Sequence, residues 1–390
     1  MQEFIDWLVY GYSIATWYEW AFLISTSLYV FLILFLTIGS LLNPKTTESN
    51  EVPTTKVTVL VSGRNEERDF PDCIDSIINL DYPKELLQII LVDDLSNDRT
   101  SDIIDEYARK HSNVIALHTK DLPDNGLEAK GRGIAHGFDV ATGEWVFVTD
   151  ADASVHPKWV KHSLHGVDET QGIIGGALVV NPVGFVGKIE RISWAFVQLF
   201  NLGMAGWGVP FACVGPNIII RRSIYENAGG LENANFSIAE DLALMEMSAK
   251  AGYKVRTLFS EETTVQLKPV PSFRHLISQQ RRWFRGGIDQ GKDFYWILWI
   301  ACSWGFFSAT WYWFAWLLNP QLYLSLVILK PIVEFTFLSI QKKRLKQKKY
   351  VRYMLILQIY LPLVFQVFIP SFLFTKKIKW MGDNYSIDFK

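Results

Sequence analysis

The pattern of apolar and polar positions begins with a long apolar run near the amino terminus. Residues 20–42 carry no charged residue and are long enough to cross a bilayer as a helix. Trp17, Tyr18 and Trp20 stand at its start, as aromatics do at a membrane interface. A cleavable signal peptide is the alternative, but the run is too long for one and lacks a basic segment before it. Residues 4–16 predict an amphipathic or interfacial helix.

A polar linker, residues 44–55, leads into a region with a different pattern. Short apolar runs there alternate with amphipathic stretches of helical length. This alternation predicts βαβ units around a mostly parallel sheet, so the expected fold class is α/β. The predicted strands are residues 56–62, 86–92, 113–118 and 145–149, and the predicted helices are residues 71–80, 96–110 and 130–141.

The second half of this region is less regular. Residues 172–180 predict a strand and residues 189–202 a helix near the membrane. Residues 215–222 read as a turn into a strand, and residues 240–250 as a helix opened by two acids.

The last third of the chain is mostly apolar. Residues 272–292 form a basic amphipathic segment, and the apolar runs that follow are residues 294–318, 322–340 and 353–374. The basic loop 342–349 predicts a cytoplasmic location, which also puts the α/β region in the cytoplasm. Pro362 and Pro370 break the last run, which is either a single crossing or a re-entrant hairpin. The predicted segments are therefore 1–43, 44–55, 56–271, 272–292, 293–376 and 377–390.

Composition adds three constraints. A net charge of −2 over 390 residues gives no case for nucleic acid binding. Aromatic residues make up 14% of the chain and gather toward both ends, which is typical of a membrane protein. The 3 cysteines form no Cys-x-x-Cys pair, so neither a disulfide framework nor a zinc site is expected.

Polar clusters follow three of the predicted strands. They are Gly63–Glu67, Asp93-Asp94 and Asp150-Ala151-Asp152. Carboxyl ends of parallel strands meet at one edge of a sheet, where open α/β sheets bind their ligands. Two carboxylates in a tight turn suit Mg²⁺ or Mn²⁺, which shares such ligands with substrate phosphates. The alternative is a turn whose acids face water, but the convergence of three clusters favours a nucleotide site.

Two further motifs lie downstream. Glu240-Asp241 opens a predicted helix, where acids can also serve only to complement the helix dipole. Gln279-x-x-Arg282-Trp283 lies in the basic amphipathic segment, which an interfacial helix would explain without any catalytic role.

Taken together, Asp94, Asp150-Ala151-Asp152, Glu240-Asp241 and Gln279-x-x-Arg282-Trp283 resemble membrane-bound glycosyltransferases of family 2. The resemblance covers residues 56–287 and implies the nucleotide-sugar fold called GT-A, flanked by transmembrane helices. Ceramide glucosyltransferase-like and polysaccharide synthase-like enzymes are similar. Ala239 departs from the family, which often has a hydroxyl residue there, and a Thr-rich gating segment of the cellulose synthase type is not found.

The resemblance implies a role for each motif. Asn65, Glu66 and Asp94 would line the base and ribose pocket, with Lys130 near the nucleotide. Asp152, supported by Asp150, would bind the divalent cation, Mg²⁺ or Mn²⁺. Asp241, beside Glu240, would be the general base, and a single base implies inversion at the anomeric carbon. Arg282 would hold the diphosphate, Trp283 would form a wall for the acceptor, and Gln279 would hydrogen-bond nearby.

The implied function is transfer of one sugar from a nucleotide-sugar, expected to be a UDP-sugar, to a lipid hydroxyl in the bilayer. Ceramide, diacylglycerol, a hydroxylated carotenoid and a polyprenyl phosphate are possible acceptors. A multi-pass protein of a bacterial inner membrane is expected, and the oligomeric state is left open. The alternatives are a processive polysaccharide synthase and an inactive membrane scaffold.

Overall fold

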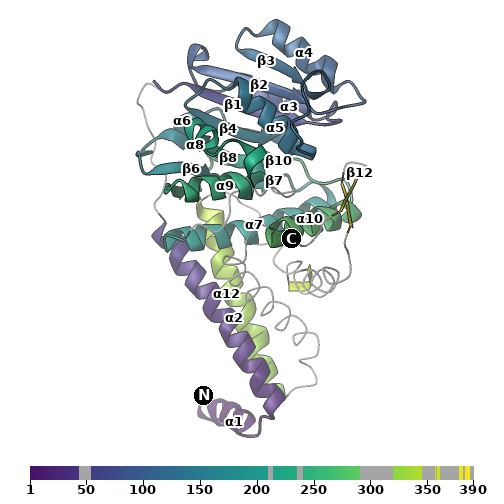
Figure 1. Ribbon diagram of the computed structural model, residues 1–390. Coiled ribbons are helices and arrows are strands. Elements are labelled where there is room, and N and C mark those ends of the chain that lie inside the picture. The colour runs from purple at the N-terminus through teal and green to yellow at the C-terminus, as the bar shows by residue number, and fades with distance from the viewer. Residues whose placement is uncertain are drawn as a thin grey trace. The chain divides into compact units, whose positions relative to one another are not determined.

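The computed structural model describes residues 1–43, 54–209, 214–234, 240–289, 319–344, 356, 358–360, 377–380 and 383–386. The chain divides into two compact units. The α/β unit comprises residues 44–183 and 208–270, and the helical unit comprises residues 1–43, 184–207 and 271–390. Figure 1 labels elements of both units.

A seven-stranded sheet forms the centre of the α/β unit, in the order β3-β2-β1-β4-β8-β6-β9. Neighbouring strands are parallel except that β8 is antiparallel to both β4 and β6. The strands are β1 (Val57–Gly63), β2 (Leu87–Asp93), β3 (Val114–His118), β4 (Trp145–Asp150), β6 (Gln171–Gly175), β8 (Ile218–Arg221) and β9 (Lys254–Thr257). The predicted α/β class with a mainly parallel sheet is confirmed, and the four predicted strands before residue 150 match within two residues.

The prediction of one strand over residues 172–180 is wrong. This stretch forms β6 and then β7 (Leu178–Val180), which belongs to a second sheet with β5 (Ala153–Ser154) and β10 (Val265–Leu267). Asn217 separates the two strands, because its side-chain Nδ2 donates to the carbonyl of Ala177 over 2.7 Å. A Cβ on Gly176 would lie 2.1 Å from that same Nδ2, so only glycine fits beside it. The apolar run is therefore interrupted by a side chain from a distant part of the sequence.

Helices cover both faces of the large sheet. They are α3 (Phe70–Ile78), α4 (Thr100–Lys110), α5 (Ala129–Val140), α6 (Trp159–Leu164), α8 (Arg222–Asn227) and α9 (Glu240–Lys250). Alternate residues of the strands, such as Leu60 and Val148, share a buried cluster with Ile134 and Phe138 of α5. On the other face, Phe147 meets Trp159 edge to face at 5.0 Å. Burial on both faces explains why β1 and β4 are mainly apolar.

The order of the strands creates a switch point between β1 and β4. From β1 the chain moves outward to β2 and β3, then returns through α5 to place β4 on the other side of β1. Loops leave β1 and β4 in opposite directions at such a point, which opens a crevice at the carboxyl ends of the two strands. The loop after Gly63 and the acids at Asp150 and Asp152 lie at this edge.

The helical unit contains the elements expected near a membrane. They are α1 (Gln2–Ser13), α2 (Trp17–Leu42), α7 (Gly184–Gly206), α10 (Phe273–Asp289) and α12 (Pro320–Arg344), with a hairpin of β11 (Lys377–Trp380) and β12 (Asp383–Ser386). Glu19 caps α2 by accepting from the backbone N–H of Thr16 over 2.7 Å. Within the part of the chain that the structure describes, α2 is the one helix long and apolar enough to cross a membrane.

The helical predictions near both ends of the chain have different outcomes. The helices predicted over residues 4–16, 189–202 and 322–340 are confirmed as helices, namely α1, α7 and α12. The run at 294–318 and nearly all of that at 353–374 lie outside the described residues, so several membrane crossings stay a prediction. Lys330 and Glu334, the two charged residues of the predicted run 322–340, pair at 2.8 Å, and Tyr29 donates to Glu334 over 2.5 Å.

Candidate active site

The loops after β1 and β2 hold each other in place. Asn65 has a positive φ of 60°, and its side-chain Oδ1 accepts from the backbone N–H of Asn97 over 2.7 Å. Its own N–H donates to Ser96 Oγ over 2.8 Å, while Leu95 also has a positive φ of 59°. Non-glycine residues in this conformation are uncommon and gather at functional sites. Asn65 thus joins the loops that follow β1 and β2 at the carboxyl edge of the sheet.

Glu66 follows in the same loop, and its backbone N–H donates to Thr100 Oγ1 over 2.8 Å. Burial raises the pKa of its carboxyl to about 8, and the negative charges of Asp152 and Asp69 add to this effect. A carboxyl with this pKa carries its proton for much of the time at neutral pH. It can then donate a hydrogen bond to a ligand as well as accept one.

Asp94 lies just beyond β2 and is 3% exposed. Arg132 of α5 holds it through two parallel bonds, from Nε to Oδ1 at 2.7 Å and from Nη2 to Oδ2 at 3.1 Å. Thr119 adds a third bond to Oδ1 at 3.0 Å. Sequence reasoning missed Arg132, because its partner lies 38 residues away and no local motif joins them.

Asp150 and Asp152 flank the turn after β4. Burial raises the pKa of Asp152 to about 7, and the charge of Asp150 contributes while Lys130 opposes it. The backbone carbonyls of both acids are anchored, since Cys73 Sγ donates to that of Asp150 at 3.3 Å and the Lys268 N–H to that of Asp152 at 3.3 Å. The predicted pair therefore sits on a fixed turn at the carboxyl edge of the sheet.

These two acids fit a divalent cation through the chemistry of their donors. Carboxylate oxygens are the ligands that Mg²⁺ and Mn²⁺ prefer, and the raised pKa of Asp152 indicates negative charge that a cation would offset. Within the described residues, no three His, Cys, Asp or Glu side chains are grouped as ligands of one ion. Mg²⁺ commonly needs only one or two carboxylates, with substrate phosphates and water completing its shell.

Lys130 connects this turn to the acids of α9. Its ammonium pairs with Asp150 Oδ1 and, at 2.9 Å, with Glu240 Oε1. Burial alone would lower the pKa of Lys130, but the charges of Asp150 and Glu240 more than compensate and raise it. Ala129, the first residue of α5, has a positive φ of 55° that ends the preceding loop directly before the lysine. A single cation thus bridges two of the predicted motifs.

Asp241 lies beside Glu240 at the start of α9. Its Oδ2 accepts from the Gly215 N–H over 3.1 Å and its Oδ1 from the Leu242 N–H over 2.9 Å. Burial raises the pKa of this carboxyl to about 7, and the charge of Glu240 adds to the rise while Lys130 opposes it. A carboxyl with a pKa near neutrality suits a general base better than an ordinary aspartate does.

The structure thus brings together Lys130, Asp150, Glu240 and Asp241 around one side of the crevice. A Cβ on Gly215 would lie 3.4 Å from Glu240 Oε1, 3.6 Å from Asp241 Oδ2 and 3.8 Å from Lys130 Nζ, so this glycine lies beside three of the four side chains. Lys130 therefore links the turn of Asp150 and Asp152 to the acids at the start of α9.

Gln279, Arg282 and Trp283 lie on α10, in the helical unit. Their helix begins at Phe273 and is strongly amphipathic in sequence, as predicted for residues 272–292. The neighbouring Gln280 is buried and donates through Nε2 to the hydroxyl of Tyr360 within the same unit. Roles for Gln279, Arg282 and Trp283 at the nucleotide site stay predictions.

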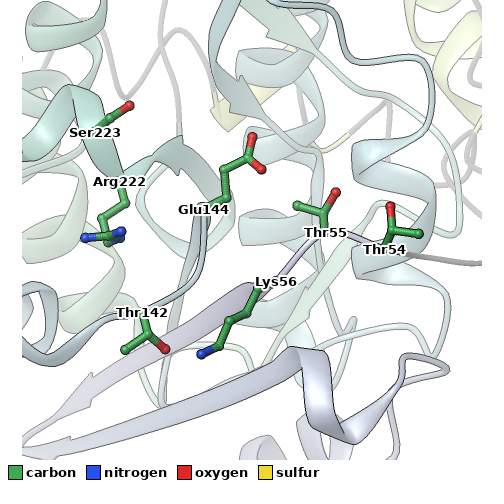
Figure 2. Close-up of a pocket in the computed structure, with 7 residues that line it drawn as sticks. All are labelled: Thr54, Thr55, Lys56, Thr142, Glu144, Arg222 and Ser223. Carbon is green, nitrogen blue, oxygen red and sulfur yellow. The ribbon is translucent and has the colours of Figure 1, made fainter.

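A pocket of about 410 Å³ lies at the opposite edge of the large sheet. Lys56 precedes β1, Glu144 precedes β4 and Arg222 follows the antiparallel β8, so these residues mark the amino ends of the parallel strands (Figure 2). Glu144 is already paired with Arg221 at 2.8 Å, and Arg222 with Glu226. This pocket contains none of the predicted site residues.

Comparisons with known proteins identify the family. A family model described as Glycosyl transferase family group 2 matches residues 145–373, and one described as Glycosyl transferase family 2 matches residues 58–229. The chain therefore belongs to the family 2 glycosyltransferases, and the resemblance inferred from the four motifs is confirmed.

A solved structure supports the fold. The mannosyltransferase PcManGT from Pyrobaculum calidifontis, in complex with GDP-Man and Mn²⁺, matches with a TM-score of 0.57 and 17% sequence identity. The match covers 91% of this chain and 97% of that chain. The α/β unit accordingly has the predicted GT-A fold.

Three curated relatives are informative. Probable glycosyltransferase YdaM of Bacillus subtilis (strain 168) is 32% identical over 252 residues, 62% of this chain and 57% of the relative. Beta-monoglucosyldiacylglycerol synthase of Trichormus variabilis is 26% identical over 250 residues, 62% and 51% of the two chains. Poly-beta-1,6-N-acetyl-D-glucosamine synthase of Staphylococcus epidermidis is 23% identical over 296 residues, 73% and 68%. The chain spans little more than half the length of the first two relatives.

Proposed function

We propose that this protein is an inverting glycosyltransferase that moves one sugar from a nucleotide-sugar, a UDP-sugar, to the hydroxyl of a membrane lipid. The observation that carries the proposal is the group formed by Lys130, Asp150, Glu240 and Asp241. It joins a turn suited to a metal-bound diphosphate to a carboxylate suited to a general base.

On the donor side, the nucleoside would lie in the crevice at the β1–β4 switch point, against Asn65, Glu66 and Asp94. Asp150 and Asp152 would hold the divalent cation. When bound, a divalent cation supplies positive charge, which would offset the negative charge that develops on the diphosphate as it leaves. Lys130 Nζ, already between Asp150 and Glu240, would add a second positive charge beside the diphosphate.

On the acceptor side, Asp241 would take the proton from the lipid hydroxyl. The hydroxyl oxygen then attacks the anomeric carbon, the bond from that carbon to the diphosphate oxygen breaks, and the nucleoside diphosphate leaves. Gly215 and Leu242 fix the base through their N–H groups, so its carboxylate is oriented before the acceptor arrives. With one base and no second carboxylate acting as nucleophile, the reaction inverts the anomeric centre.

Two observations favour a lipid acceptor. Helix α2 is long and apolar enough to span a membrane, and α10 carries a basic amphipathic sequence of the kind that lies at a membrane surface. One relative is named as a synthase of glucosyldiacylglycerol. We also propose that Gln279, Arg282 and Trp283 lie at the membrane interface. Arg282 would bind the diphosphate there, and Trp283 would form a wall for the acceptor. The multi-pass membrane location belongs to the same proposal.

The experiment incubates full-length protein in lipid nanodiscs with single nucleotide-sugars, Mg²⁺ or Mn²⁺, and a total lipid extract, followed by mass analysis of new glycolipids. We expect a lipid carrying one added hexose, lost in Asp241→Asn and kept in the control Asp139→Asn, whose side chain is 68% exposed. Equal activity in Asp241→Asn would remove the assignment of the base.

The alternative of a processive polysaccharide synthase is supported by the relative that makes poly-N-acetylglucosamine. The same experiment separates the two functions, because a synthase would yield a ladder of sugar polymers in place of a glycolipid. An inactive scaffold would give neither product with any donor.

A further inference from the structure

The hydrogen bonds around Asp94 limit what its carboxylate can recognise. An ionised carboxylate has two oxygens and about four positions at which it can accept a hydrogen bond. Arg132 occupies one position on each oxygen, and Thr119 occupies the second position on Oδ1. One position is left, on Oδ2.

The pairing with Arg132 is durable. It is a two-bond, charge-assisted contact, which is the strongest class of hydrogen bond between side chains. Asp94 is 3% exposed, so removing either partner would leave a charge buried without a counter-charge. A ligand that enters the crevice can therefore bond only to the acceptor position of Asp94 that Arg132 and Thr119 leave open.

Nucleobases differ in the number of hydrogen-bond donors that they present to such a carboxylate. The edge of guanine presents two parallel donors, N1–H and N2–H, which pair with both oxygens of one carboxylate in the same two-bond arrangement that Arg132 uses. The edge of uracil presents a single donor, N3–H, which needs one acceptor position. Arg132 and guanine compete for the same sites, whereas uracil can use the remaining position on Oδ2.

We propose that Arg132 is a specificity-determining residue that makes the donor site select uracil-type bases and reject guanine, by occupying the paired acceptor positions of Asp94. This proposal rests on the proposed function, in which Asp94 faces the base. A guanine would leave at least one buried donor unpaired, a loss that corresponds to about tenfold or more in affinity.

The test measures binding of UDP and GDP to the full-length protein in nanodiscs by titration calorimetry, with Mn²⁺ present. We expect wild-type protein to bind UDP at least about tenfold more tightly than GDP. Equal affinities in wild-type protein would overturn the proposal, even while sugar transfer persists. Absence of any nucleotide binding, together with absence of transfer, would instead overturn the proposed function and this inference with it.

A variant then assigns the selectivity to Arg132. Lysine keeps the positive charge but cannot donate two parallel hydrogen bonds to one carboxylate. Arg132→Lys should therefore reduce the ratio of UDP affinity to GDP affinity by about fivefold or more. The matched control is Arg109→Lys, an exposed arginine of α4, which should keep the wild-type ratio. A folded Arg132→Lys protein with an unchanged affinity ratio would contradict the proposal. If that variant does not fold, the ratio of UDP to GDP affinity in the wild-type protein tests the proposal instead.

Discussion

The raised pKa of Asp241 predicts a specific pH dependence for sugar transfer. A general base must be ionised to accept a proton, and burial together with the charge of Glu240 raises the pKa of Asp241 to about 7. With this pKa, roughly one carboxylate in eleven is ionised at pH 6 and roughly ten in eleven at pH 8. We therefore expect kcat/KM to rise by about tenfold between these two pH values.

The Glu240→Gln variant tests the physical origin of this shift. Glutamine keeps an oxygen that can accept from Lys130 but removes the negative charge beside Asp241. The rising limb of the pH profile should then move to lower pH. In Asp241→Asn the base is lost, and we expect a fall of about 10² to 10⁴ in kcat across the whole range.

The assay is initial-rate glycolipid formation from pH 5.5 to 9 at a saturating concentration of divalent cation. Saturation matters because a bound cation favours ionised Asp152 and keeps its titration out of the profile. Nucleotide affinity is measured at pH 6 and pH 8 as a control. A wild-type profile that is flat from pH 6 to 8, or a Glu240→Gln profile that coincides with the wild-type one, would refute the assignment of Asp241 as the titrating base.

Three other outcomes follow from the same geometry. Asp150→Asn and Asp152→Asn should each weaken UDP binding in the presence of Mn²⁺ by about tenfold or more, measured by calorimetry, and unchanged affinity would rule out the predicted metal turn. Asn217→Ala should destabilise the protein by about 2–4 kcal/mol, read from its unfolding transition, because the buried Trp159 Nε1 and the carbonyls of Ala177 and Thr263 lose their partner. Burial raises the pKa of Glu66 from 4.5 to about 8, so between these values the folded protein binds the proton that the unfolded chain has lost. The melting temperature should therefore fall as pH rises from about 4.5 to about 8, and less so in Glu66→Gln.

Much of the α/β unit could be predicted because its signals are local. The four predicted strands before residue 150 are mainly apolar runs, and a polar cluster directly follows three of them. The rule that parallel strands present their carboxyl ends at one edge then places these clusters together without any further information. That reasoning located Glu66, Asp94, Asp150 and Asp152 at the correct edge of the sheet.

The contacts that set the properties of the site could not be predicted in this way. Arg132 reaches Asp94, and Lys130 reaches Glu240 from more than a hundred residues away, because α5 packs tightly on β1. That packing depends on Gly133 and Gly137, where a Cβ would lie 2.1 Å from Ser62 Oγ and 2.2 Å from Leu60 Cδ1. The break between β6 and β7 likewise depends on Asn217, whose side chain enters from another part of the chain.

The charges of the site explain why two aspartates have a pKa near 7. Asp150, Asp152, Glu240 and Asp241 supply four carboxylates, and Lys130 is the ammonium paired within this group. One cation cannot offset four anions in a buried setting, so the site lowers its charge by holding protons on Asp152 and Asp241. A divalent cation held by Asp150 and Asp152 would supply positive charge that this group lacks, so Asp152 should give up its proton when the cation binds.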